Sequence, residues 1–103
     1  MALFRRGRMA PVHVRLFGRP GCGLCDDAER WLRAEGRRVI LETVDVSTDP
    51  DLERRYGMWV PVVEIEGHVR LKARFDRSGL VAEVRRAGVR PAGRAPGARR
   101  ATT

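Results

Sequence analysis

Two cysteines in this chain are separated by two residues, as Cys22-Gly23-Leu24-Cys25. A strand-like segment ends before this pair and a helix-like segment begins within it, which places Cys22 at a helix N-terminus. A thiol attacks as its thiolate, and an ordinary cysteine pKa of about 8.5 leaves little thiolate at neutral pH. The free N–H groups and the positive dipole end of a helix stabilise that anion. We therefore predict thiol–disulfide exchange in which Cys22 is the nucleophile and Cys25 attacks the resulting mixed disulfide.

Three charged residues near the pair should act on the Cys22 pKa in opposite directions. Arg19 lies three residues upstream and adds a cation that favours the thiolate. Asp26 and Asp27 favour the start of the helix, but as anions near Cys22 they oppose its ionisation. The balance between these charges depends on three-dimensional geometry.

Other interpretations of the cysteine pair stay open. The two thiols could be inert small hydrophobes. They could form half of a zinc site with His13 and His68, although these histidines have no recognised ligand spacing. They could hold an iron–sulfur cluster shared between two chains. The chain could also be a redox-silent interaction module whose basic ends bind an acidic partner. A Cys-x-x-Cys pair after a strand in a βαβ pattern favours the redox dithiol.

The spacing of apolar residues and of turn residues predicts seven elements in the order β-α-β-α-β-β-α. The four predicted strands cover residues 12–17, 39–46, 62–65 and 69–75. The three predicted helices cover residues 24–35, 50–56 and 77–87. Asp49 and Asp76 have the side chains that cap helix starts, and Gly36, Gly57 and Gly88 are expected to end the helices.

Two of the predicted strands carry further expectations. The strand at residues 39–46 is apolar enough to lie centrally in a sheet. The strand at residues 69–75 alternates strictly, so its apolar side chains should share one buried face. Glu66-Gly67 between the last two strands suits a tight hairpin turn with positive φ.

The length of 103 residues is typical of one domain, and the basic charge is concentrated at its ends. Residues 1–10 and 90–103 hold seven arginines and no acid, which leaves +1 of the net charge of +8 for residues 11–89. We predict a flexible basic extension at 1–10, a folded domain at 11–89 and a disordered basic tail at 90–103. Because these ends have almost no aromatic residues, no nucleic-acid partner is expected.

No apolar run approaches the ~20 residues needed to cross a bilayer, and no apolar stretch follows the N-terminal charges as in a secretory signal. We expect a cytoplasmic monomer without a membrane partner.

Over roughly residues 12–88 the sequence resembles the glutaredoxin-like proteins of the thioredoxin-fold superfamily. The resemblance is carried by residues 16–25 (LFGRPGCGLC), 44–46 (VDV) and 59–62 (WVPV). It implies an α/β thioredoxin-like fold with a central four-stranded mixed sheet. It also implies an enzyme that reduces or exchanges protein disulfides or glutathione mixed disulfides. Such an enzyme has no bound cofactor and is regenerated by an external thiol reductant.

The resemblance assigns roles to four further residues. Pro61 should follow a cis peptide bond and face the dithiol, and the backbone of Val60 should pair with the substrate's cysteine segment. Arg19 stands where dithiol glutaredoxins often carry a lysine, so it should lower the thiol pKa or hold a glutathione carboxylate. Trp59 should be either a wall of the active site or a core aromatic.

The sequence departs from the family pattern at three places. Gly23-Leu24 stand where Pro-Tyr is common between the cysteines, and Trp59 replaces a threonine. Residues 73–76 (ARFD) occupy the place of a glycine pair that admits the γ-glutamyl end of glutathione. These departures weaken the case for glutathione, which stays one candidate co-substrate beside disulfide-containing proteins.

Overall fold

The computed structural model describes residues 7–91, and its side chains over residues 10–89. A four-stranded mixed sheet of order β3-β2-β4-β5 forms its centre. Its strands are β2 (Val12–Gly18), β3 (Val39–Asp45), β4 (Val62–Ile65) and β5 (His68–Lys72). Strand β2 runs parallel to β3 and antiparallel to β4, and β5 is antiparallel to β4. The predicted mixed sheet is confirmed.

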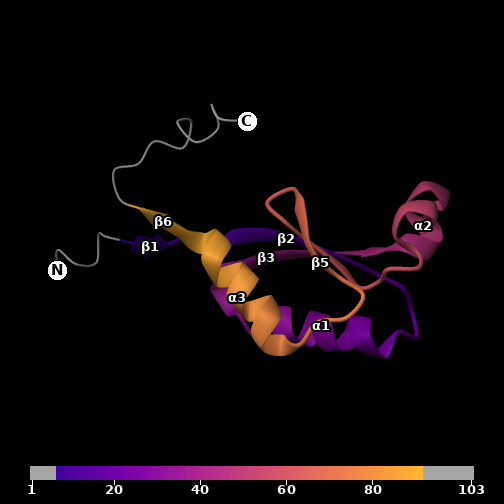
Figure 1. Ribbon diagram of the computed structural model, residues 1–103, viewed down its shortest axis with the longest axis horizontal. Coiled ribbons are helices and arrows are strands. Elements are labelled where there is room, and N and C mark those ends of the chain that lie inside the picture. The colour runs from indigo at the N-terminus through magenta and orange to yellow at the C-terminus, as the bar shows by residue number, and fades with distance from the viewer. Residues whose placement is uncertain (1–6, 92–103) are drawn as a thin grey trace.

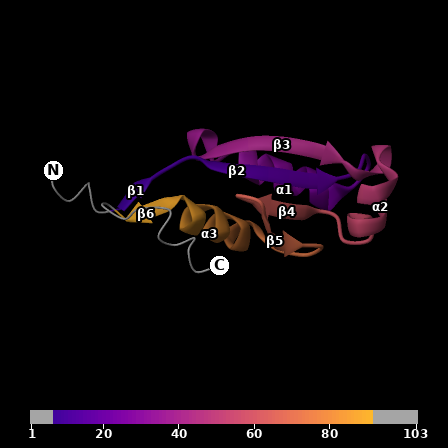
Figure 2. The same ribbon diagram turned by 90° about the horizontal axis from the view of Figure 1, so that it is seen from above.

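Three helices surround this sheet: α1 (Gly23–Arg33), α2 (Pro50–Tyr56) and α3 (Arg77–Gly88). Helices α1 and α3 lie together on one face of the sheet, and α2 lies at one end of it (Figures 1 and 2). The predicted order β-α-β-α-β-β-α is confirmed for the central domain. None of the helices described within residues 7–91 is long and apolar enough to cross a membrane.

The starts of α2 and α3 form as predicted, because an aspartate accepts backbone N–H groups at each. Asp49 accepts the N–H of Asp51 at 2.9 Å, and Pro50 occupies the first helical position, where no N–H is needed. Asp76 accepts the N–H of Gly79 at 2.8 Å. This bond and the one from Ser78 hold the pKa of Asp76 below its ordinary value, so the cap stays charged at neutral pH.

The main core lies between the sheet and helices α1 and α3. Alternate residues of β2 point to this side of the sheet. They pack against apolar residues that are spaced about one turn apart along each of the two helices. The buried members are Val12, Val14, Leu16, Ala28, Leu32, Val63, Ile65, Leu80 and Val84. Complete burial of one such valine or leucine contributes about 1.5–3 kcal/mol.

A second, smaller cluster fixes α2 beside the end of β2. Phe17, which alternates away from the main core, is buried with Val46 and Val62. Leu52 and Tyr56 of α2 pack against this cluster, and the rings of Phe17 and Tyr56 are 4.8 Å apart. This contact holds α2 next to the loop that leads into the cysteine pair.

The prediction that the strand at residues 39–46 lies centrally is wrong. Strand β3 is an edge strand that pairs only with β2 within the described chain, and half of the Ile40 side chain is exposed. Its apolar residues reflect two separate contacts, since Val39 and Leu41 pack on the main core and Val44 packs on the second cluster. Because β3 contributes side chains to both clusters, it is as apolar as a central strand although it lies at the edge of the sheet.

The strict alternation predicted for residues 69–75 is broken by a bulge. Leu71 is opposite Val63, but Val69 is opposite Glu64, so Arg70 is an extra residue between them. An extra residue reverses the facing of those before it. Val69 therefore points to the solvent side and is 42% exposed. The strand ends at Lys72, three residues earlier than predicted.

The predicted hairpin turn at Glu66-Gly67 is confirmed, whereas the helix expected to end at Gly36 ends earlier. Glu66 and Gly67 have φ values of 50° and 83°, as the tight hairpin between β4 and β5 requires. Helix α1 ends at Arg33, two residues before the predicted Glu35, and Gly36 then takes a positive φ of 61°. Glu35 itself turns inward, where its carboxylate lies 3.5 Å from Nε of Arg85.

A two-stranded ribbon that the sequence did not predict joins the two ends of the domain. Strand β1 (Gly7–Met9) pairs antiparallel with β6 (Val89–Pro91), and the N–H of Ala10 donates to the carbonyl of Gly88 at 2.7 Å. The predicted domain, residues 11–89, therefore leaves out β1 and divides β6, although the backbones of these two strands are paired. The rest of the predicted basic extension and tail, residues 1–6 and 92–103, lies outside the described residues.

Candidate functional site

The cysteine pair lies at the N-terminus of α1, as predicted. Cys22 is the capping residue of the helix, and its Sγ accepts the N–H of Cys25 at 3.1 Å. The two cysteines form a disulfide, with their Cα atoms 5.2 Å apart. Gly21, with a φ of 80°, turns the chain into this position.

The two sulfur-bearing side chains differ in their access to solvent. Cys25 is 6% exposed, whereas Cys22 is half-buried. After reduction, the N–H of Cys25 would also donate to a Cys22 thiolate, which lowers a thiol pKa. The accessible and hydrogen-bonded member of the pair is therefore the predicted nucleophile.

Gly18 is a site residue to which sequence reasoning gave no role of its own, beyond its place in the motif at residues 16–25. A Cβ atom at this position would lie 3.0 Å from both Cβ and Sγ of Cys25. Any larger residue at the end of β2 would therefore require Cys25 to move by a few tenths of an ångström. A glycine at the end of a strand is a signal for such a close approach.

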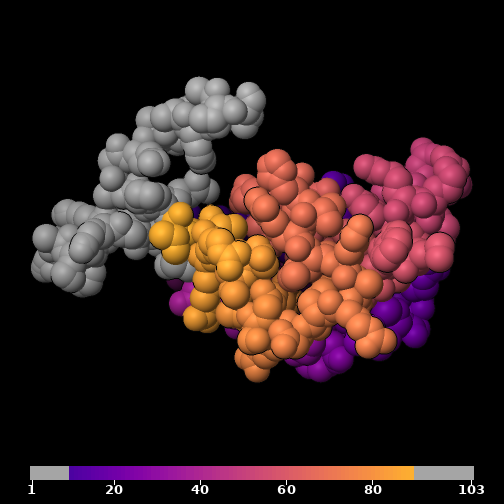
Figure 3. Space-filling model, viewed as in Figure 1, coloured from indigo at the N-terminus to yellow at the C-terminus, as the bar shows by residue number. Residues whose placement is uncertain are grey.

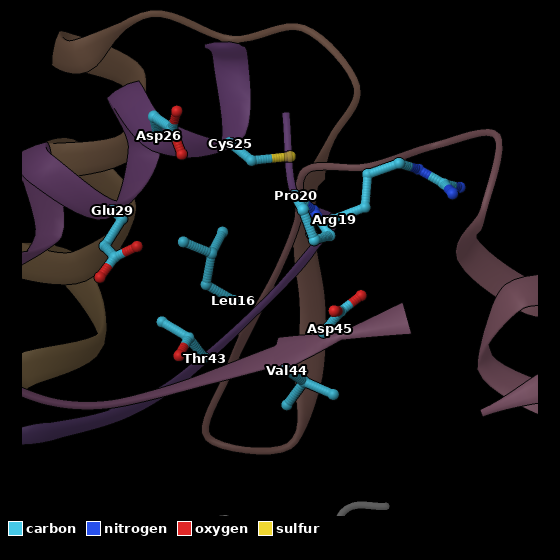
Figure 4. A pocket seen from close by; sticks show the side chains of 10 residues that line it. Leu16, Arg19, Pro20, Cys25, Asp26, Glu29, Thr43, Val44 and Asp45 are labelled. Carbon is cyan, nitrogen blue, oxygen red and sulfur yellow. The ribbon is translucent and has the colours of Figure 1, made fainter. Parts of the chain in front are cut away.

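Arg19 connects the loop before Cys22 to α2. Its guanidinium donates to the Glu53 carboxylate at 2.8 and 3.3 Å and to the carbonyl of Gly57 at 2.7 Å. The bond to Glu53 raises the Arg19 pKa, and the negative charges of Glu53 and Asp45 add to this effect. Figure 4 shows the Arg19 guanidinium extending away from the Cys25 sulfur. Sequence reasoning did not identify Glu53 as its partner, and no signal in the sequence linked the two.

An open cavity of about 210 Å³ adjoins Cys25 (Figure 4). Leu16 and Val44 contribute apolar side chains to its lining, and carboxylates come from α1 and from the end of β3. These carboxylates belong to Asp26, Glu29 and Asp45. Acidic groups therefore share a solvent-filled space with the less exposed cysteine.

The loop before β4 contains the other three predicted site residues. The Val60–Pro61 peptide bond is cis, as the resemblance implied, and Pro61 is buried. Trp59 is 47% exposed, so it is not a core aromatic, and Nζ of Lys72 lies 4.9 Å from its ring centre. The backbone N–H and carbonyl of Val60 form no hydrogen bond within the described residues, so Val60 offers a free edge.

Ala73 holds this loop in place. Its N–H donates to the carbonyls of both Trp59 and Pro61 at 2.9 Å, and its φ is 69°. A left-handed backbone costs a residue with a Cβ atom roughly 1–2 kcal/mol, a cost that glycine does not carry.

We expect Ala73→Gly to stabilise the protein by about 0.5–1 kcal/mol. The substitution removes the backbone strain at Ala73, and this gain exceeds the cost of the greater conformational entropy that glycine gives the unfolded chain. Ala73→Val should destabilise it, because a β-branched residue at positive φ is more strained. Urea unfolding of the two variants measures both effects. A less stable Ala73→Gly protein would show that this backbone is not strained.

The zinc interpretation gains no support from the geometry. Within residues 10–89, no three His, Cys, Asp or Glu side chains come close enough together to hold a metal ion. His13 and His68 therefore do not complete a site with the two cysteines.

A mixed sheet with a dithiol at the N-terminus of its first covering helix defines a thioredoxin-fold protein, and solved structures share this fold. A mutant thioredoxin from Halobacterium salinarum NRC-1 matches with a TM-score of 0.57 and 21% identity, over 77% of this chain and 76% of that one. The oxidised thioredoxin from Plasmodium falciparum matches with a TM-score of 0.58 and 13% identity, over 77% and 83%. At these identities the likeness concerns the fold alone.

Residues 13–85 match the model of the glutaredoxin-like domain (DUF836), so the chain belongs to this glutaredoxin-like family. The structural-genomics target protein XcR50 from X. campestris is 34% identical, with a TM-score of 0.61. The match covers 69% of this chain and 93% of that one. The predicted family resemblance and thioredoxin-like fold are confirmed.

Proposed function

We propose that this protein is a thiol–disulfide oxidoreductase that reduces or exchanges protein disulfides or glutathione mixed disulfides. The observation that supports this most strongly is the asymmetry of the dithiol. Cys22 is accessible, caps a helix and accepts an N–H at its sulfur, while its partner Cys25 is buried beside it.

The reaction proceeds in two exchanges. The Cys22 thiolate attacks one sulfur of the substrate disulfide, forms a mixed disulfide and releases the other sulfur as a thiolate. Cys25 then loses its proton and attacks Sγ of Cys22, which releases the second substrate thiolate and leaves the Cys22–Cys25 disulfide. An external thiol reductant supplies two electrons to return both cysteines to thiols. No bound cofactor is needed, and the reducing thiol pool of the cytoplasm suits this cycle.

The second exchange needs an acceptor for the Cys25 proton. The cavity beside Cys25 gives that proton a path to water, and Asp26, Glu29 and Asp45 line the same cavity. Asp45 is kept ionised by hydrogen bonds from Ser47, which hold its pKa below the ordinary value. Because a fixed negative charge disfavours a nearby thiolate, the cavity aids the second exchange by giving the Cys25 proton a path to water.

The substrate chain pairs with the free backbone edge of Val60, next to Pro61, and rests on the exposed ring of Trp59. Arg19 keeps the loop before Cys22 joined to α2, so that it positions the nucleophile. The protein acts as a monomer in this scheme.

Turnover of the unmodified protein tests the proposal directly. The protein should accelerate the reduction of insulin by dithiothreitol, as seen in the turbidity of the released chains. Thiolate absorbance recorded against pH should give a Cys22 pKa below the ordinary value of about 8.5. A protein that accelerates the reduction of neither insulin nor a glutathione mixed disulfide would reject the enzymatic function.

A further inference from the structure

Four basic side chains lie within eight residues of the chain, from β5 to the first residue of α3. We call this group the basic corner, and its members are Arg70, Lys72, Arg74 and Arg77. All four are exposed. Figure 3 shows this stretch, coloured orange, at the surface of the domain between α2 and α3.

The basic corner differs from most basic positions on the helices, because its charge is not neutralised locally. Arg30 and Arg33 of α1 lie 2.7 and 2.8 Å from carboxylates within one turn of their own helix. Arg54 of α2 is paired in the same way with Asp51. Among the described residues, no carboxylate lies within 4.0 Å of a basic group of the corner.

The acids nearest in the chain already have partners. Asp76 caps α3 through the N–H of Gly79, and Glu64 on the neighbouring strand lies 3.3 Å from Arg15. With Asp76 counted, residues 70–77 keep a net charge of +3. The segments whose side chains the structure does not describe, 1–9 and 90–103, contain no Asp or Glu that could balance it.

This charge lies directly beside the loop that carries the free Val60 edge. Ala73, in the middle of the corner, donates its N–H to the carbonyls on either side of Val60. Lys72 lies over the ring of Trp59, 4.9 Å from its centre. Met58, in the same loop, is 88% exposed.

We propose that the basic corner selects disulfide substrates in which acidic residues flank the reactive cysteine of a polypeptide. This inference rests on the proposed oxidoreductase function and names its substrate class. Acidic side chains next to the cysteine would meet Arg70, Lys72 and Arg74 while the backbone pairs with Val60. Opposite charges on two partners accelerate their encounter, whereas like charges on them disfavour binding.

The observations favour an acidic polypeptide over two other anions. A glutathione molecule carries two carboxylates and one ammonium, a net charge of only about −1, so it balances less of the +3 charge of residues 70–77 than an acidic polypeptide does. Nucleic acid is bound through phosphate contacts together with bases stacked on successive aromatic rings, and Trp59 is the one exposed aromatic side chain among the described residues. Exposed Trp and Met side chains, here Trp59 and Met58, are enriched in protein interfaces.

Three synthetic peptides of equal length test the inference. Each has a central cysteine joined by a disulfide to the same chromophoric thiol, and its flanking residues are all Glu, all Gln or all Lys. At low salt we expect kcat/KM to fall in the order Glu, Gln, Lys, with about tenfold or more between the first and last. Added salt should shrink this ratio.

The double variant Arg70→Glu with Arg74→Glu should lose at least tenfold on the Glu peptide and prefer the Lys peptide. The milder pair Arg70→Gln with Arg74→Gln should show the same direction. The control pair Arg37→Glu with Arg86→Glu makes the same change in net charge outside the corner, in the turn after α1 and in the last turn of α3. It should keep the original order of preference.

The outcomes separate this inference from the function on which it rests. A wild-type protein that reduces none of the peptides rejects the oxidoreductase itself. Equal rates on all three peptides, or a control pair that changes the preference as strongly as the test pair, reject only the basic corner. A glutathione disulfide of the same chromophore that reacts faster than the Glu peptide also rejects it, because a small thiol would then be the occupant.

Discussion

Cys22→Ser should abolish disulfide reduction and leave only the rate seen without protein. The variant retains Cys25, but that thiol is only 6% exposed and lies behind the capping position, so it cannot begin the exchange. A serine hydroxyl is not ionised at neutral pH and cannot replace the thiolate. Reduction of insulin by dithiothreitol measures the loss, and a thermal unfolding curve checks that the variant is folded.

Cys25→Ser should behave differently, because the first attack remains possible and the second does not. The variant should accumulate a mixed disulfide between Cys22 and the substrate, visible by mass spectrometry and reversed by excess thiol. Our assignment of the two roles would be reversed if Cys25→Ser were inactive and Cys22→Ser formed the trapped adduct. Full turnover of Cys25→Ser on glutathione mixed disulfides would instead indicate a monothiol route.

Substitutions at Gly18 should damage the dithiol without removing either sulfur. Gly18→Ala places a Cβ atom 3.0 Å from Cβ and Sγ of Cys25, so that Cys25 must shift by several tenths of an ångström. Gly18→Val adds two further carbons and forces a larger shift. Because misplacement by about 1 Å can cost roughly a hundredfold in rate, we expect losses of about tenfold for alanine and a hundredfold for valine. Overpacking should also reduce stability by about 1–3 kcal/mol.

Stopped-flow kinetics with a chromophoric disulfide can show which step is affected. The resolving attack by Cys25 should slow, whereas the first attack by Cys22 should change less, so mixed disulfide should accumulate. Gly23→Ala is a matched control, because a Cβ atom there meets nothing within 4 Å. If Gly18→Val resolved the mixed disulfide as fast as the Gly23→Ala control, the close approach would have no functional importance.

Most of the local structure could be predicted, because it depends on neighbours in the chain. Asp49 and Asp76 cap helices through N–H groups two or three residues away. The Glu66-Gly67 turn likewise depends on the φ values of two adjacent residues. The placement of Cys22 at a helix start follows from the same short-range pattern.

Predictions about sheet position and facing were less accurate, because both depend on partners distant in sequence. Strand β3 contains enough apolar residues for a central position, yet β2 takes that place by pairing on both of its edges. The bulge at Arg70 arises from the fit between β4 and β5, and it moves Val69 to the solvent side. The β1–β6 ribbon joins residues about 80 positions apart, beyond any local signal.

The sequence by itself determined the family, the order of the central elements and the placement of the Cys-x-x-Cys pair at a helix start. Each of these follows from residue type and short-range spacing, which are properties of the chain before it folds. Only the tertiary structure decided that Gly18 touches Cys25, that Glu53 engages Arg19 and that the charge of the basic corner lies beside Val60. These contacts bring together residues that are distant in the chain. Their geometry depends on how the strands and helices pack, which the spacing of residues along one segment does not encode.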